Sequence, residues 1–265
     1  STFVAWQWKA NGGTTTTNDA SSTGVGTIDS VYQANTTAGF SIVTYTGTGS
    51  AATVGHGLGL TPSLIIFKNR TSANVWATYH HSLGNNKKLE LNGTGAEDAD
   101  GAFMNGTLPT SSVFSVGASA NTNTSSNNYV AYCFNDVQGY SKFGKYTGNS
   151  HSGGDGTFVY TGFTPAFVLI KRTDSTNDWI IHDYKLGTLN ATGSSKGNIF
   201  NLNSAALRAN EGASQLDDWG SIDMYSNGFK PRSDAASVNA SGTYIYMAFA
   251  HAPFVTSTGI PTTAR

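Results

Sequence analysis

The chain has 265 residues, with 15 Lys or Arg and 16 Asp or Glu, so its net charge is −1. Charged residues make up only 12% of the sequence, which supplies neither the basic stripe of a nucleic-acid-binding protein nor the composition of a helical bundle. Every apolar run is far shorter than the roughly 18 residues that cross a membrane, so we expect no membrane insertion and no nucleic-acid partner.

The first predicted element is a strand over residues 3–8, whose pattern recurs over residues 129–134 and 244–249. In each strand, large apolar side chains alternate with smaller or more polar ones, and a period of two puts the large side chains on one face. We expect that face to point into the core. The large side chains are Val4, Trp6 and Trp8; Val130, Tyr132 and Phe134; and Ile245, Met247 and Phe249. We interpret residues 1–27 as the terminal strand of a preceding unit followed by a linker.

Two longer units follow, over residues 28–138 and 139–265, because several motifs occur twice. Residues 61–68 read TPSLIIFK and residues 164–171 read TPAFVLIK, and the same offset relates Trp76 to Trp179. The continuous apolar runs predict strands buried on both faces, each ended by a lysine at the solvent boundary.

Strand patterns and turn residues dominate the whole chain, and the best short-helix candidate covers only residues 203–208. The sequence therefore predicts an all-β fold. It consists of two tandem antiparallel β-sandwich repeats of jelly-roll-like type, preceded by the N-terminal strand left from an earlier repeat. The two tryptophans at matching positions after the apolar strands are interpreted as core residues.

The acidic residues form two clusters, which are Glu97, Asp98 and Asp100, and Asp217, Asp218 and Asp223. A glycoside hydrolase needs two carboxylates about 5–10 Å apart across a cleft. We interpret both clusters as solvated turn residues, with a catalytic pair or a cation site as alternatives. The single cysteine, Cys133, lies inside a strand and is interpreted as a small buried residue. We predict no catalytic residues, no metal and no cofactor.

Four residues are candidate binding residues. Trp219 is surrounded by polar residues, and an exposed indole of that kind can stack on a sugar or anchor an interface, whereas packing is the alternative. His80 and His81 are adjacent, so on a strand they are expected to face opposite ways and not to chelate a metal together. His151 lies in the loop sequence NSHSGGD, where the alternative is a plain loop tip.

Several segments resemble a repeat domain found in virion proteins of tailed bacteriophages, many of them marine or cyanobacterial phages. The segments are residues 39–49 (GFSIVTYTGTG), 56–62 (HGLGLTP), 130–134 (VAYCF), 160–165 (YTGFTP) and 253–265 (PFVTSTGIPTTAR). The resemblance extends over nearly the whole chain and consists of strand and turn residues. It implies a virion location and attachment to the host surface, and it supplies no catalytic or ligand-binding residues.

The leading hypothesis is a non-enzymatic virion structural protein, a tail fibre or receptor-binding module that binds bacterial surface glycan or protein. A capsid decoration or head-fibre protein, which contacts mainly other virion proteins, is the alternative. A tailspike polysaccharide depolymerase is disfavoured, because the two units hold no carboxylate pair at matching positions. A fibre is expected to be a homo-oligomer, and the analogy with the phage family implies a trimer.

Overall fold

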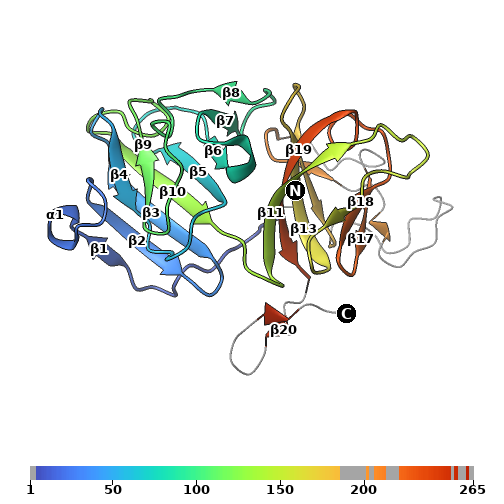
Figure 1. Cartoon of the computed structure of the whole chain (residues 1–265), viewed down its shortest axis with the longest axis horizontal. Coiled ribbons are helices and arrows are strands. Elements are labelled where there is room, and N and C mark those ends of the chain that lie inside the picture. The colour runs from blue at the N-terminus through green and yellow to red at the C-terminus, as the bar shows by residue number, and fades with distance from the viewer. Residues whose placement is uncertain are drawn as a thin grey trace. The chain divides into compact units, whose positions relative to one another are not determined.

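The computed structural model describes residues 4–185, 201–202, 206–212, 221–251, 254–255 and 261–262. The ordered elements are almost all β-strands (Figure 1). The described helices are α1, which covers Ala20–Thr23, and the 3-10 turn η1, which covers His81–Leu83. No helix in these described parts is long and apolar enough to cross a bilayer.

The chain forms two compact units. Unit 1 consists of residues 1–79, 84–86 and 100–135, and unit 2 consists of residues 80–83, 87–99 and 136–265. Two short segments from the middle of the first predicted repeat therefore belong to unit 2.

Unit 1 is built from two sheets that pack on one core. Its main sheet has the strand order β1-β2-β3-β10-β5-β6, and the pairs from β1 to β5 are antiparallel. The bounds are β1 Thr16–Asn18, β2 Ser30–Asn35, β3 Phe40–Thr46, β10 Asn128–Phe134, β5 Leu64–Asn69 and β6 Ala77–His80. The smaller sheet pairs β4 (Ala52–Gly55) with β9 (Val113–Val116). Val43 and Phe67 of the main sheet meet Val54 and Phe114 of the smaller one in the core.

Unit 2 has the same two-layer construction. Its main sheet has the order β11-β19-β13-β14-β16, and the second sheet has the order β12-β18-β17-β15. The bounds are β11 Ser141–Gly148, β19 Gly242–Ala250, β13 Pro165–Arg172, β14 Trp179–Asp183, β16 Leu207–Arg208, β12 Val159–Tyr160, β18 Gly228–Pro231, β17 Ile222–Tyr225 and β15 Asn201–Leu202. Val168 and Ile170 of the main sheet share a core with Ile222 and Phe229 of the second sheet. Two hairpins complete the unit, and they are β7 (Lys87–Glu90) with β8 (Asp98–Ala99), and β20 (Phe254–Val255) with β21 (Pro261–Thr262).

The predicted all-β, sandwich-like fold is confirmed, and so are the positions of the two apolar strands. β5 lies between β10 and β6, and β13 lies between β19 and β14. Adjacent residues such as Leu64 and Ile65, or Leu169 and Ile170, point to opposite faces and are all buried. Continuous apolar runs therefore marked strands in the interior of a sheet, as expected for strands covered on both sides.

The predicted core face of β10 and β19 is wrong. The central clusters of the two units contain the opposite set, which is Tyr129, Ala131 and Cys133 in β10 and Tyr244, Tyr246 and Ala248 in β19. These tyrosines pack their rings in the core, and the hydroxyls of Tyr129 and Tyr244 donate to the Ala120 and Ala236 carbonyls in loops. The small side chains leave room for the rings of the facing layer. The large apolar side chains are buried too, except for Tyr132, which is half-buried. Size and polarity therefore did not distinguish the two faces.

The predicted N-terminal strand does not form in the part of it that the structure describes. Residues 4–8 are not in a strand, and Val4 is 45% exposed. The closing strand that they resemble, β10, lies inside its sheet with β3 and β5 on either side, so a second copy has no vacant place there. Instead, Trp8 meets Phe134 edge-on with ring centroids 5.9 Å apart.

Two short segments also differ from expectation. The predicted linker over residues 9–27 contains β1 and α1, whose N-cap is Asp19. In the short-helix candidate over residues 203–208, the described residue 206 forms a β-bridge and residues 207–208 form β16.

The hairpin segment 87–99 is tied into unit 2 by hydrogen bonds. Its Glu90 carbonyl accepts from Trp179 Nε1 at 2.8 Å, and its Thr94 carbonyl accepts from Lys171 Nζ at 3.2 Å. Trp179 is thus a core residue as predicted, but Lys171 is fully buried and does not lie at the solvent boundary. Burial lowers the pKa of Lys171 to about 8.

A buried asparagine fastens one end of the main sheet in each unit. Asn123 Oδ1 accepts the Thr48 N–H at 2.8 Å, and its Nδ2 donates to the Ser50 carbonyl at 2.5 Å. In unit 2, Asn239 Oδ1 accepts the Asn149 N–H at 3.2 Å. Both asparagine side chains are fully buried. The loop that enters β10 or β19 is therefore held against the loop that leaves β3 or β11.

Beside each asparagine, two tyrosine rings stack. The centroids of Tyr45 and Tyr129 are 5.3 Å apart, and those of Tyr146 and Tyr244 are 5.0 Å apart. The Tyr45 hydroxyl donates to Thr122 O at 2.6 Å, and the Tyr146 hydroxyl donates to Val238 O at 2.6 Å. We call the asparagine and the stacked tyrosines the end clamp of each unit.

A glycine next to the end clamp of unit 2 allows the backbones to approach closely. A Cβ on Gly148 would lie only 2.1 Å from the Ala240 carbonyl oxygen, so Gly148→Ala forces the two loops apart. We expect this variant to lose about 1–3 kcal/mol of unfolding free energy in urea denaturation. Gly95→Ala is the matched control, because nothing lies within 4 Å of a Cβ at Gly95. Equal stability of the two variants would contradict this account of the clamp.

Candidate functional site

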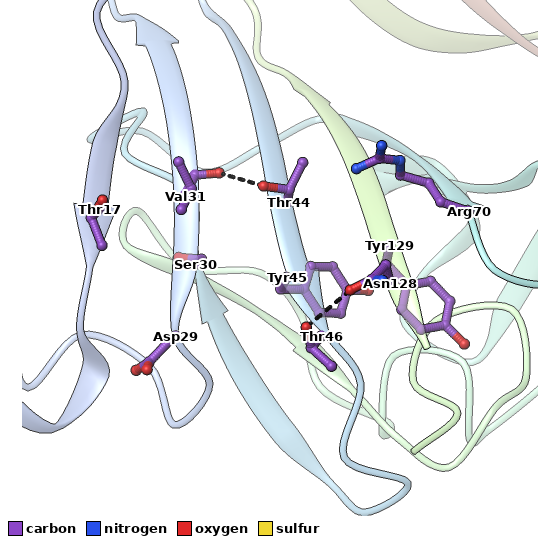
Figure 2. Close-up of a pocket in the computed structure, with 10 residues that line it drawn as sticks. All are labelled: Thr17, Asp29, Ser30, Val31, Thr44, Tyr45, Thr46, Arg70, Asn128 and Tyr129. Carbon is purple, nitrogen blue, oxygen red and sulfur yellow. Dashed lines mark hydrogen bonds between the residues drawn. The ribbon is translucent and has the colours of Figure 1, made fainter. Parts of the chain in front are cut away.

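A groove with a volume of about 250 Å³ lies on the outer face of the main sheet of unit 1 (Figure 2). Its floor is formed by Thr17 of β1, Val31 of β2 and Thr44 of β3, which are direct partners in the strand register. β-Branched residues favour such pleated positions, and their methyl groups give the floor an apolar character. Val31 is 36% exposed, which is high for an apolar side chain in the middle of a sheet.

A row of polar side chains borders this floor. Thr46 Oγ1 donates to Asn128 Oδ1 at 3.1 Å, which leaves the Asn128 amide N–H groups as donors. Arg70 follows β5 immediately, and its backbone N–H donates to Asn128 O at 2.7 Å. At the other end of the row, Asp29 Oδ1 accepts the Ala20 N–H at 2.9 Å. Figure 2 shows Arg70 and Asp29 at opposite ends of the groove.

The groove therefore offers hydrogen-bond donors at one end, a carboxylate at the other and methyl groups between them. Such an arrangement can bind a polar molecule that also has a hydrocarbon surface. The groove was not predicted from the sequence because its polar residues Asp29, Thr46, Arg70 and Asn128 come from four separate segments of the chain. Only the strand register brings them onto one face, and no local motif encodes that register.

Two of the candidate histidines, His80 and His81, contact backbone groups of the protein itself. His80 is fully buried, its Nδ1 accepts the Ser82 N–H at 3.1 Å, and its Nε2 faces Tyr246 O at 3.4 Å. His81 Nε2 lies 3.3 Å from Phe143 O. The expectation that the two rings face opposite ways is wrong, because β6 ends at His80 and the chain turns into η1. The ring centroids are consequently only 4.8 Å apart.

The other two candidates have different outcomes. His151 is exposed in the loop between β11 and β12, where its Nδ1 accepts the N–H groups of Gly153 at 3.1 Å and Asp155 at 3.3 Å. Trp219 lies outside the described residues. Trp76, interpreted as a core residue, is only half-buried and stacks on Tyr132 with centroids 6.3 Å apart.

In the two acidic clusters, the residues that the structure describes form ion pairs or hydrogen bonds with neighbouring side chains. Glu97 pairs with Lys87, and Asp98 pairs with Lys88 at 2.6 Å. Asp100 accepts the Ser119 hydroxyl at 3.1 Å. Asp223 was interpreted as a solvated turn residue, but it is buried in β17. Asp217 and Asp218 lie outside the described residues. Within the described part of the chain, no group of three His, Cys, Asp or Glu side chains could hold a metal ion.

The two-layer antiparallel sheets define the class as an all-β, sandwich-like protein. A family model described as a domain of unknown function (DUF7483) matches residues 1–253, so the chain belongs to that family. No curated protein matches the chain, and no solved structure matches it.

Two buried histidines predict how stability depends on pH. Burial lowers the pKa of His56 to about 4 and that of His80 to about 3, from an ordinary value of 6.5. The folded chain keeps both rings neutral, whereas the unfolded chain takes up protons below pH 6.5. We expect the free energy of unfolding to fall as the pH is lowered from 6.5 to 4.

Each histidine contributes at most about 1.4 kcal/mol per pH unit to this fall. Urea denaturation across this range, with His56→Gln as a variant that flattens the slope, tests the expectation. A slope of the opposite sign would refute it.

Cys133 is confirmed as a small buried residue of the core. Burial raises the pKa of its thiol well above the ordinary value, which suppresses the reactive thiolate. We expect iodoacetamide at pH 8 to leave the folded chain unlabelled and to label the urea-unfolded chain completely, as measured by intact mass. Labelling at similar rates in both states would contradict the burial of this residue.

Proposed function

We propose that this chain is a non-enzymatic structural protein of a bacteriophage virion, a tail-fibre or receptor-binding module that attaches the particle to a bacterial surface. The resemblance of its strand and turn motifs to a phage virion repeat domain supports the virion location. The groove of unit 1 is the observation that best supports the proposed attachment function. It exposes donors, a carboxylate and methyl groups on a sheet whose end is fixed by a buried clamp.

We propose further that the two units are tandem copies of one module. The strand order β3-β10-β5-β6 of unit 1 corresponds to β11-β19-β13-β14 of unit 2, and an end clamp occurs at the matching place in each. Repeated modules give a fibre both length and several copies of a weak binding surface, and weak contacts add strongly when they act together.

The side chains that catalysis would recruit most readily serve the fold. His56 is buried between the Leu58 N–H at 3.2 Å and the Thr110 carbonyl at 3.2 Å. His80 and Cys133 are buried as well. Burial keeps these three groups away from a substrate. A polysaccharide depolymerase would use carboxylates, and the described carboxylates Glu97 and Asp98 are paired with Lys87 and Lys88, which favours an attachment module.

The partners in this proposal are other virion proteins and a glycan or protein receptor on the bacterium. The chain would act outside the cell as part of the particle, as a homo-oligomer, and as a trimer if it forms a fibre. A capsid decoration or head-fibre protein is the alternative, and it differs in location on the particle rather than in fold.

Immunogold labelling of intact phage particles with an antibody against the purified chain tests this proposal. We expect gold at the distal end of the tail, because an attachment module must reach the bacterial surface first. The control is the same antibody after absorption with the purified chain. Gold over the capsid would replace attachment with decoration, and particles without gold would refute the virion location. Release of reducing ends from host polysaccharide by the chain would refute the non-enzymatic assignment.

A further inference from the structure

Two exposed aromatic side chains stand out on the second sheet of unit 2. Phe158 is 44% exposed, and Tyr160 in β12 is 63% exposed. Val159 between them is 4% exposed and points into the core, so the two aromatic side chains lie on the outer face of the sheet. Burying these two rings would have stabilised the fold by removing apolar surface from water. Neighbouring apolar side chains that stay exposed often mark a binding surface.

The strand register brings a third aromatic ring onto this face. Gly228 of β18 pairs with Tyr160 on one side and with Tyr225 of β17 on the other. Phe158 meets Tyr225 edge-on, with centroids 5.9 Å apart. A Cβ on Gly228 would lie 2.9 Å from Phe158 Cζ, so the Phe158 ring lies over the glycine. Phe158, Tyr160 and Tyr225 thus form one surface, which we call the aromatic platform.

Hydrogen-bonding groups border the platform. Arg232 donates to the Asp223 carboxylate and to the Tyr225 hydroxyl, and its NH1 donates to the Gly154 carbonyl at 2.6 Å. The Arg232 guanidinium carbon lies 5.8 Å from the centre of the Tyr225 ring. This network holds Tyr225 in place and leaves its ring on the surface of the platform.

A second ion pair and an exposed histidine lie next to Arg232. Lys230, which pairs with Asp223 in the strand register, makes a salt bridge to Asp155. His151 begins the same loop turn, and because its Nδ1 accepts two backbone N–H groups, its neutral ring carries the proton on Nε2. The border therefore contains two cations matched by two anions, together with a donor on the histidine.

These features favour one class of ligand. Aromatic rings attract an apolar surface, and the paired charges give the border polar groups without a net charge. A pyranose has a C–H face that can lie on aromatic rings and hydroxyls around its edge that can both donate and accept. An anionic ligand would call for unpaired cations, and Lys230 and Arg232 are both paired.

We propose that the aromatic platform of unit 2 binds a neutral saccharide by stacking on Phe158, Tyr160 and Tyr225, with the Arg232 and Lys230 ion pairs and His151 contacting its hydroxyls. This inference rests on the proposed attachment function and names the ligand class and the surface. It places that surface on a different unit from the groove described above.

Saturation-transfer difference NMR on the full chain tests the platform. The probes are the methyl glycosides of glucose, galactose, mannose and N-acetylglucosamine, each measured separately. We expect signal on the ring protons of at least one probe. Replacing two rings by Phe158→Ala with Tyr160→Ala should lower that signal about fivefold, as expected from about 1 kcal/mol of lost stacking.

Leu108→Ala is the matched control, because Leu108 is 53% exposed in unit 1 and lies outside both surfaces. If the double variant fails to fold by circular dichroism, Tyr160→Ala alone replaces it, since that side chain is the most exposed of the three. Unchanged signal in the folded variant, or no signal from any probe with the unmodified chain, would overturn the platform. Gold at the tail tip together with either result would retain attachment and reject this saccharide site.

Discussion

The clamp at the end of each main sheet is the constraint on which the rest of the structure depends. A closing strand covered on both faces must leave the sheet through loops, and those loops carry backbone groups that cannot be buried without partners. Asn123 and Asn239 supply the partners, and the stacked tyrosines beside them fill the space under the loops. With both loops fixed, the outer faces of the sheets can carry exposed side chains in defined positions.

Polar chemistry is divided between the interior and the surface. Inside, His56, His80 and Lys171 are held by backbone carbonyls and shifted towards their neutral forms by burial. Outside, Arg70 and Asp29 border one surface, while ion pairs border the aromatic platform. The interior groups serve the fold, and the exposed groups remain accessible to a partner. This division is compatible with the attachment function that we propose.

Local sequence patterns were sufficient for the fold class and for the two interior strands, and insufficient for the core faces and for the candidate sites. The apolar run of β5 indicated an interior strand, since the neighbouring residues Leu64 and Ile65 are buried on opposite faces. The same reasoning failed for β10, because buried residues lie on both of its faces and a tyrosine can face the core when its hydroxyl finds a carbonyl. The groove and the platform depend on register between strands distant in sequence. Gly228, for example, is recognised as part of the platform only because the register pairs it with both Tyr160 and Tyr225.

The placement of residues 87–99 limits how this module could be exchanged in evolution. Unit 2 draws the acceptor for the Trp179 indole and an acceptor for the Lys171 ammonium from a hairpin that precedes most of the unit in sequence. A recombination crossover near residue 136 would deliver the second unit without that hairpin and leave a buried cation short of a partner. If the two units are modules, as we propose, unit 2 keeps these two hydrogen bonds on transfer only when an equivalent hairpin is transferred with it.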